Sequence, residues 1–313
     1  MNTFLGLGTA AIGRPEYINI RQESSAKHSL SEFKSKGIGL LMFAYKQGIH
    51  YFDTAPGYGM AEEMLINWLY SLKPSPVDIA TKWGYTYTAN FDPNAKVHEV
   101  KEHSIDKLNE QWEFSKALLP RLKYYQIHSA SFESGVLNND KILNRLNELK
   151  EKHNLIIGLT TTGTNQLGVL QKALEIEKNG SQLFQLFQVT YNIFDQSLRT
   201  IADSITSKLV IKEALANGRV FPNEDFPNYT EAYHILSKLS QKYKVGIDAI
   251  ALRFCMDSIP VFKVLSGAAT IEHLKSNLKA NDFRLKQEDI DLLNSLAVNS
   301  NTYWNERKKL NWN

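Results

Sequence analysis

The chain has 313 residues, of which 43% are hydrophobic, enough for one large core. Its 36 basic and 33 acidic side chains give a formal charge of +3 without a basic block, so neither a nucleic acid nor an anionic membrane is expected as a partner. No apolar run approaches the roughly 18 residues of a membrane helix, and the first apolar stretch lacks the cationic region of a signal peptide. We therefore expect a cytoplasmic protein. Because Cys255 is the only cysteine, we expect no intrachain disulfide and no cysteine-based metal cluster.

Strand-like apolar runs alternate with amphipathic helical patterns along the whole chain, which is typical of parallel βα units. The helical patterns include Leu30 to Gln47, Met60 to Leu72, Lys141 to His153 and Gln166 to Lys178. The eight expected strands are Leu5 to Thr9, His50 to Thr54, Val77 to Lys82, Tyr124 to His128, Leu155 to Thr160, Phe184 to Val189, Lys208 to Lys212 and Val261 to Leu265. Eight such units close a (β/α)8 TIM barrel, and no repeat or linker divides it, so a single domain over residues 1–313 is predicted.

Two stretches do not fit the alternating pattern. One is Asn217 to Asn228, and the other is the tail from residue 298 to 313, which contains Tyr303, Trp304 and Trp312. Long loops and tails of a barrel often close over a substrate, so we expect the tail near the rim of the active site.

Four polar residues follow the predicted strands at the point where each strand ends. Asp53 and Tyr58 follow the second strand, Lys82 ends the third and His128 ends the fourth. In a (β/α)8 barrel these ends form one rim, where the chemistry of the fold takes place. A phenol with an ordinary pKa of about 10 needs such neighbours to act as a proton donor. The pattern therefore predicts one catalytic site built from these four residues.

A dinucleotide-binding fingerprint is an alternative interpretation of the first strand. Gly6, Gly8 and Ala11 match its G-x-G-x-x-A form. Gly13 and Pro15 follow at once, where the fingerprint needs a helix to begin, so a barrel strand is favoured.

A zinc-protease motif is suggested by His98 and Glu99, but His103 lies five residues after His98 instead of four, and Glu102 occupies the ligand position. We interpret this segment as a solvated helix face and expect no metal. No G-x-S-x-G elbow and no P-loop pattern occurs.

The segment Gly48 to Gly59, GIHYFDTAPGYG, resembles the signature of the aldo-keto reductases. Further blocks resemble the same family in order along the chain: Ala61 with Glu62, Ile79 to Lys82, Gln126 to His128, Gly158 to Thr161, Phe187 to Asn192, Leu252 to Phe254 and Ser266 to Asn277. The resemblance implies a barrel that binds NADP, or alternatively NAD, without a Rossmann domain, and that acts on a small carbonyl or sugar substrate without a metal.

By this resemblance Tyr58 is the general acid that protonates the carbonyl oxygen as hydride reaches the carbon. Lys82, paired with Asp53, would lower the pKa of Tyr58, and His128 would hydrogen-bond the carbonyl oxygen and orient the substrate. In the reverse direction the tyrosine would act as the base.

The resemblance also implies a set of cofactor-binding residues, some of which depart from the family pattern. Thr160 and Thr161 stand where a Ser-Asn pair is usual, Lys212 stands where an aromatic commonly stacks on the nicotinamide, and His273 stands where many relatives carry arginine. The whole expected set is Thr9, Asp53, Thr160, Thr161, Gln188, Lys212, Gly267, Thr270, His273 and Asn277.

Substrate contacts are expected from Trp83, His128 and Trp304, since aromatic side chains suit both sugars and aromatic carbonyls. Two alternatives remain at this point. One is a lyase in which Lys82 forms a Schiff base, and the other is a cofactor-binding regulatory subunit with slow turnover.

Overall fold

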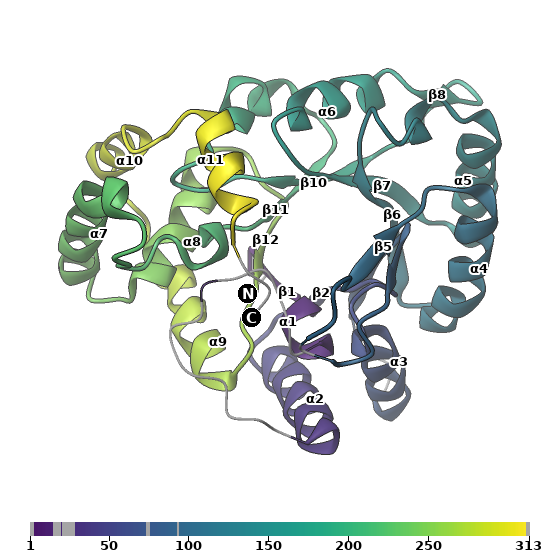
Figure 1. Cartoon of the computed structure of the whole chain (residues 1–313), viewed down its shortest axis with the longest axis horizontal. Coiled ribbons are helices and arrows are strands. Elements are labelled where there is room, and N and C mark those ends of the chain that lie inside the picture. Colours follow the sequence, from purple (N-terminus) through teal and green to yellow (C-terminus); the bar gives the residue numbers. More distant parts are fainter. Residues whose placement is uncertain (1–2, 15–19, 21–28, 73–75, 93, 311–313) are drawn as a thin grey trace.

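The strands of the chain close into a barrel whose axis is nearly along the view of Figure 1. The computed structural model describes residues 3–14, 20, 29–72, 76–92 and 94–310. The barrel strands are parallel and follow the cyclic order β1-β12-β11-β10-β7-β6-β3-β2. Their bounds are β1 Leu5–Gly8, β2 Tyr51–Asp53, β3 Asp78–Trp83, β6 Leu122–Ala130, β7 Ile156–Thr161, β10 Leu186–Thr190, β11 Lys208–Lys212 and β12 Lys263–Ser266. The predicted (β/α)8 barrel is confirmed, and each expected strand coincides with one of these within a few residues.

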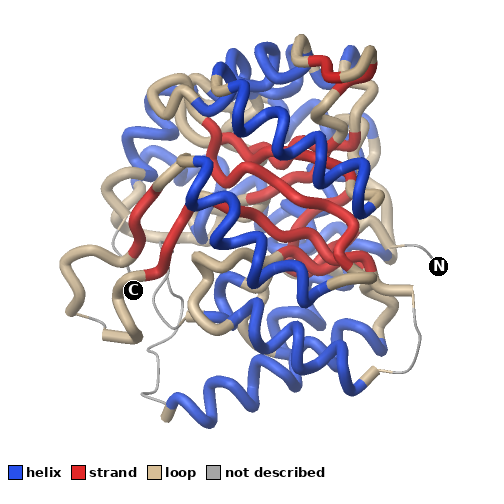
Figure 2. The backbone as a smooth tube through the Cα atoms, turned by 90° about the vertical axis from the view of Figure 1, so that its right-hand side faces the viewer, coloured by secondary structure: helices blue, strands red, loops and turns tan. Residues whose placement is uncertain are grey.

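Helices surround the barrel on its outside, as Figure 1 shows end-on and Figure 2 shows from the side. The described helices are α1 Ala10–Gly13, α2 Leu30–Lys46, α3 Ala61–Ser71, α4 Ile105–Ser115, α5 Asp140–His153, α6 Gln166–Leu174, α7 Thr230–Tyr243, α8 Ile247–Ser258, α9 Ile271–Leu278, α10 Gln287–Asn294 and α11 Ser300–Arg307. Of these, α11 lies at the carboxyl ends of the strands. None of the described helices is long and apolar enough to cross a membrane.

Local capping explains where several of these helices begin. Ser29 and Glu32 form a reciprocal capping box at the start of α2, and the side chain of Ser104 accepts a hydrogen bond from the amide of Lys107 in α4. Asn154 ends α5 in the left-handed conformation that a helix terminus often adopts.

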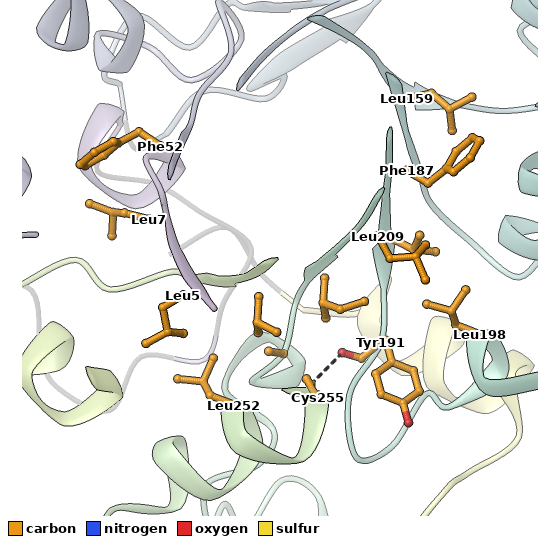
Figure 3. Packing of buried hydrophobic residues seen from close by; sticks show 14 of the residues in the cluster. Leu5, Leu7, Phe52, Leu159, Phe187, Tyr191, Leu198, Leu209, Leu252 and Cys255 are labelled. Atoms are coloured by element: carbon orange, nitrogen blue, oxygen red, sulfur yellow. Dashed lines mark hydrogen bonds between the residues drawn. The ribbon is translucent and has the colours of Figure 1, made fainter. Parts of the chain in front are cut away.

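The alternation of side chains along each strand produces two apolar layers. One set points outward and packs against the helices; Leu7, Phe52 and Phe187 belong to it in Figure 3. Cys255 is buried in the same layer, and its thiol lies 3.4 Å from the carbonyl oxygen of Tyr191, in agreement with a packing role. The second set fills the interior of the barrel and consists of Tyr51, Ala80, Tyr124, Leu186, Val210 and Leu265.

Two local predictions need correction. The segment around His98 and Glu99 is not a helix face, because Glu99–Lys101 forms β5, which pairs antiparallel with β4, Tyr85–Tyr87. The helix expected over Gln166 to Lys178 ends at Leu174. Glu177–Lys178 instead forms the short strand β8, which pairs antiparallel with β9, Ser181–Gln182.

The chain also contains short 3-10 helices, at Lys116–Leu118, Val136–Asn138, Ser197–Thr200, Ala202–Ser204, Ala216–Gly218, Pro227–Tyr229 and Lys279–Asn281.

Candidate active site

The inward-facing side chains change from apolar to polar toward the carboxyl ends of the strands. On β2 the inward position after Tyr51 is Asp53, on β3 Ala80 is followed by Lys82, and on β6 Tyr124 is followed by Gln126 and His128. The same alternation places Gln188 and Thr190 on β10 and Lys212 on β11 after apolar positions. One buried polar layer therefore lies at the end of the barrel where this fold builds its active sites.

Asp53 and Lys82 form a fully buried ion pair at the centre of this layer. The Lys82 Nζ lies 2.6 Å from Asp53 Oδ2 and also donates a hydrogen bond to the Thr54 carbonyl at 2.9 Å. The other carboxylate oxygen accepts a hydrogen bond from the Gln188 amide at 2.7 Å. These bonds satisfy both charges, which burial would otherwise make costly.

Tyr58 and His128 converge above the ion pair. The Tyr58 hydroxyl lies 3.5 Å from His128 Nε2, and the two rings meet edge to face with centroids 5.5 Å apart. The Lys82 Nζ lies 4.6 Å from the centre of the Tyr58 ring. The four residues expected to act together are thus brought into one cluster.

Burial governs the protonation of both groups. The pKa of Tyr58 is raised well above its ordinary range by burial and by the charge of Asp53, whereas the Arg14 guanidinium works in the opposite direction. The pKa of His128 is lowered well below its ordinary range by burial and by nearby cations, Lys82 first among them. These directions favour the neutral form of both groups at pH 7, and the lowering of the Tyr58 pKa expected from Lys82 stays a prediction.

The sequence patterns gave no sign of Arg14, which lies in the loop after α1. Its guanidinium is buried, donates a hydrogen bond to the Gly57 carbonyl at 3.0 Å and pairs with Glu99 at 2.8 Å. Its central carbon lies 5.5 Å from the centre of the Tyr58 ring. A lone arginine between a glycine and a proline carries no periodic or motif signal, so only the fold brings it to the site.

The side chains expected around the nicotinamide lie at the same end of the barrel, with Gln188 and Thr160 buried and Lys212 half-buried. Gln188 is bonded to Asp53, and the hydroxyl of Thr160 accepts a hydrogen bond from the Ser129 amide at 2.7 Å. The Lys212 Nζ lies 3.0 Å from the Thr190 hydroxyl, and burial lowers the pKa of Lys212 despite the opposing charge of Glu213.

Two threonines of the expected set are bonded elsewhere. The Thr9 hydroxyl donates to the Asp53 carbonyl at 3.0 Å, and the Thr161 hydroxyl lies 3.5 Å from Gln166 Oε1, toward α6. These contacts support the loops that carry the site.

Helix α11 contacts the loops that follow β10 and β11. Arg307 pairs with Glu213 at 2.6 Å, and the buried Arg219 donates to the Tyr303 carbonyl at 3.1 Å and pairs with Glu306 at 3.2 Å. The described part of the tail is thus fixed beside Lys212, at the carboxyl ends of the strands; Trp312 lies outside the described residues.

The residues expected at the adenine end of the cofactor lie at and after the end of β12. Thr270 caps α9 by accepting a hydrogen bond from the His273 amide at 3.1 Å, and the space beside Gly267 is open within 4 Å of the place a Cβ would occupy. Asn277 is buried, accepts a hydrogen bond from Ser266 and donates one to Asp248, each at 2.6 Å. His273 is exposed.

The two tryptophans expected to touch substrate are both buried. Trp83 packs edge to face on His103, and the Nε2 atom of His103 lies 2.9 Å from the His128 carbonyl oxygen. The Trp83 ring is therefore linked to the backbone of His128 through His103. Trp304 donates its indole N–H to Asp195 at 3.0 Å. Besides Tyr58, the ring of Tyr85 lies against His128, with centroids 4.6 Å apart.

Within the described ranges, no group of three or more histidine, cysteine, aspartate or glutamate side chains is arranged to hold a metal ion.

Comparisons with known proteins agree with this geometry. The model of the Aldo/keto reductase family matches residues 5–298. A curated relative, the NADH-specific methylglyoxal reductase of Escherichia coli (strain K12), is 24% identical over 289 residues, which cover 83% of this chain and 87% of that protein.

Solved structures show the same fold at low sequence identity. The glycerol dehydrogenase from Gluconobacter oxydans has a TM-score of 0.72 at 20% identity, with 94% of this chain and 91% of that chain covered. The holo form of an aldo-keto reductase from Bacillus halodurans has a TM-score of 0.69 at 20% identity, with 94% and 92% covered.

Proposed function

Because the chain belongs to the aldo/keto reductase family and is an NAD(P)H-dependent oxidoreductase, we propose that it reduces a small aldehyde or ketone with Tyr58 as the general acid. The observation that carries this proposal is the convergence of Tyr58 and His128. Their polar atoms are 3.5 Å apart, so a single carbonyl oxygen that lies beside both, at hydrogen-bonding distance from each, is able to accept hydrogen bonds from both.

The protonation states support the direction of reduction. A buried neutral phenol is ready to give up its proton when negative charge develops on the substrate oxygen, and a neutral imidazole donates a hydrogen bond without bringing a charge. In alcohol oxidation the phenolate would take the proton back, so that reaction gains from high pH.

The residues present fit a nicotinamide cofactor. The Oε1 atom of Gln126 is buried without a hydrogen-bond partner among the described residues, and Gln188, Thr160 and Lys212 supply further polar atoms in the same layer. Gln188, Thr160 and Lys212 would hold the carboxamide end. When bound, the reduced cofactor supplies the hydride.

The cofactor preference follows from the charges near α9. His273 replaces the arginine that many relatives carry, and the Lys275 Nζ lies 5.7 Å from the centre of the Phe43 ring, directed at α2. Fixed positive charge for a 2′-phosphate is therefore sparse. The curated relative is named as NADH-specific. We infer that this enzyme accepts NADH at least as well as NADPH, in contrast to the NADP expected from the resemblance alone.

The contacts of Lys82 argue against a Schiff-base lyase. Its ammonium group is bonded to Asp53 and Thr54 and is fully buried, which leaves no free amine to attack a carbonyl. No specific contact favours the regulatory-subunit alternative.

One experiment tests the proposal. NADH and NADPH absorbance is followed with purified protein and a panel of aldehydes, ketones and sugars, with Tyr58→Phe as the variant and Tyr45→Phe as a tyrosine control outside the site. We expect Tyr58→Phe to lower kcat by at least a hundredfold, since general acid catalysis contributes about 10²- to 10⁴-fold. Equal rates in Tyr58→Phe and wild type would reject Tyr58 as the acid.

A further inference from the structure

Strand β6 contains one extra residue at the position of His128. Its pairing with β7 leaves two residues of β6, His128 and Ser129, opposite the single residue Thr160 of β7. This is the arrangement of a β-bulge, which changes the direction of a side chain and often occurs next to active sites. Ser129 has a φ of +51°, in the left-handed region that residues other than glycine seldom adopt. Such strain persists only where the surroundings hold it, so the bulge depends on the contacts around it.

Hydrogen bonds hold the bulge on both of its sides. Toward β7, the Thr160 hydroxyl accepts a hydrogen bond from the Ser129 amide at 2.7 Å. On the other side, β3 pairs with β6 only as far as Trp83, and beyond that point His103 Nε2 lies 2.9 Å from the His128 carbonyl oxygen. Because a carbonyl oxygen can only accept, Nε2 carries the proton of this hydrogen bond.

The imidazole of His103 is itself closely packed. It meets the Trp83 ring edge to face with centroids 5.4 Å apart, and a Cβ at Gly84 would lie 2.4 Å from its Cδ2 atom. Gly84 has a φ of +110°, and its amide donates a hydrogen bond to Gln111 Oε1 at 2.7 Å. Only glycine at position 84 leaves room for the ring. Burial lowers the pKa of His103 to about 4, which favours the neutral imidazole at pH 7.

The direction of the His128 ring depends on this backbone. Its Nδ1 atom is buried and has no hydrogen-bond partner among the described residues, and its Nε2 atom faces the Tyr58 hydroxyl. The ring of Tyr85 packs against the imidazole with centroids 4.6 Å apart. Because no described side chain holds Nδ1, the backbone at His128 and Ser129 determines where Nε2 points.

We propose that His103 is a positioning residue that, together with Thr160, holds the bulge and thereby directs the ring of His128 at the substrate oxygen. This inference rests on the proposed reduction of a carbonyl beside Tyr58 and His128. His103 acts only through the backbone of His128, so its loss changes the geometry of the reaction and leaves the cofactor site intact.

The experiment compares His103→Met with His103→Gln in the full-length protein. Glutamine supplies an N–H donor near the position of Nε2, whereas methionine has a similar length and no donor. For the aldehyde that the wild type reduces fastest, we expect His103→Met to lower kcat/KM by about tenfold to a hundredfold, because a misplacement of about 1 Å costs up to about a hundredfold. His103→Gln should recover most of this loss. The dissociation constant of NADH, measured by nicotinamide fluorescence, should be unchanged in both variants.

The direction of the His128 ring is measured separately by NMR. The protein is labelled with histidine that carries ¹³C in its ring, and the His128 signal is assigned by its absence in His128→Gln. Ring currents of Tyr58 and Tyr85 act on this signal, since their ring centres lie 5.5 Å and 4.6 Å from that of His128. We expect the signal to shift in His103→Met and to return toward its wild-type position in His103→Gln. His234→Met, which changes an exposed histidine on α7, is the control and leaves the signal unchanged.

An unchanged His128 signal or an unchanged kcat/KM in His103→Met would overturn the proposal, as would equal losses of kcat/KM in His103→Met and His103→Gln. If His103→Met does not fold, Thr160→Val and Thr160→Ser make the same comparison through the His128 signal. Valine lacks the oxygen that accepts the hydrogen bond from Ser129, and serine keeps it. A signal that shifts equally in these two variants would also count against the proposal.

The two proposals fail in different ways. If Tyr58→Phe keeps full activity, the proposed acid is rejected, whereas the His128 signal still reports whether His103 directs that ring.

Discussion

At the scale of single residues, the site depends on charges that are buried in pairs. Asp53 and Lys82 are each almost wholly removed from water, and Gln188 and Thr54 complete their hydrogen bonds. A buried pair of this kind contributes little net stability compared with apolar packing, but removing one partner leaves the other charge uncompensated.

We therefore expect Lys82→Met to lower the free energy of unfolding by about 3 to 5 kcal/mol. Adding Asp53→Asn to Lys82→Met should restore part of this loss because the unpaired charge is then gone. Urea unfolding measures both variants. The exposed pair of Lys34 and Glu63 provides the control, since Lys34→Met should cost less than about 1 kcal/mol. Equal losses in Lys82→Met and Lys34→Met would contradict the argument.

Lys212 supports a second prediction at this scale. It lies at the carboxyl end of β11, its side chain is 18% exposed, and the family resemblance implies an aromatic ring on the nicotinamide at this position. If its ammonium contacts the cofactor, Lys212→Met should weaken NADH binding by about tenfold, as the loss of one charge-assisted hydrogen bond implies. Nicotinamide fluorescence measures the binding. Lys208→Met, at the other end of β11, is the matched control, and an equal affinity in both variants would remove Lys212 from the cofactor site.

At the scale of elements, helix α11 is fixed to the barrel through Glu213. Burial alone would raise the pKa of Glu213, but the cations of Arg307 and Lys212 outweigh it and hold the pKa at about 2, below the ordinary 4.5. Because the pKa is lower in the folded state, the stabilisation is present above pH 4.5 and is lost as the pH falls toward 2.

This linkage predicts that the free energy of unfolding of the wild type falls by about 3 kcal/mol between pH 5 and pH 2 because Glu213 takes up a proton. Glu213→Gln should be less stable than the wild type at pH 6 and should show a shallower dependence on pH in that window. Chemical denaturation at several pH values tests it. Glu224→Gln, which changes an exposed carboxylate, should retain the wild-type slope. A steep slope in Glu213→Gln would refute the assignment.

At the scale of the whole molecule, closure of the barrel brings together residues that are far apart in the chain. Asp53 and Gln188 are 135 positions apart, yet their side chains are 2.7 Å from each other. The alternation of strand and helix patterns predicted this closure, and strand ends placed Asp53, Lys82 and His128 correctly, because both follow from periodicity.

Other features had no such signal. The charges of Arg14 and Glu99 meet only because a hairpin follows β3, where helical spacing was expected. The pKa of Tyr58 depends on how deeply the phenol is buried and on every charge around it, and residue types alone do not give that burial. Helix α11 is held by long-range ion pairs such as Arg307 with Glu213, and no apolar stripe marked it in the sequence.

Closure also sets a steric limit inside the barrel, where the strands are closely packed. A Cβ at Gly158 on β7 would lie 2.6 Å from the backbone oxygen of Leu186 on β10, and this atom cannot yield without moving a barrel strand. Gly158→Ala should therefore lower the free energy of unfolding by about 1 to 3 kcal/mol, or more. In α2, a Cβ at Gly39 meets nothing within 4 Å, so Gly39→Ala should raise stability by about 0.5 to 1 kcal/mol. Urea unfolding of the two variants side by side tests this expectation. If Gly158→Ala were as stable as Gly39→Ala, the backbone oxygen of Leu186 would not exclude a methyl group at position 158.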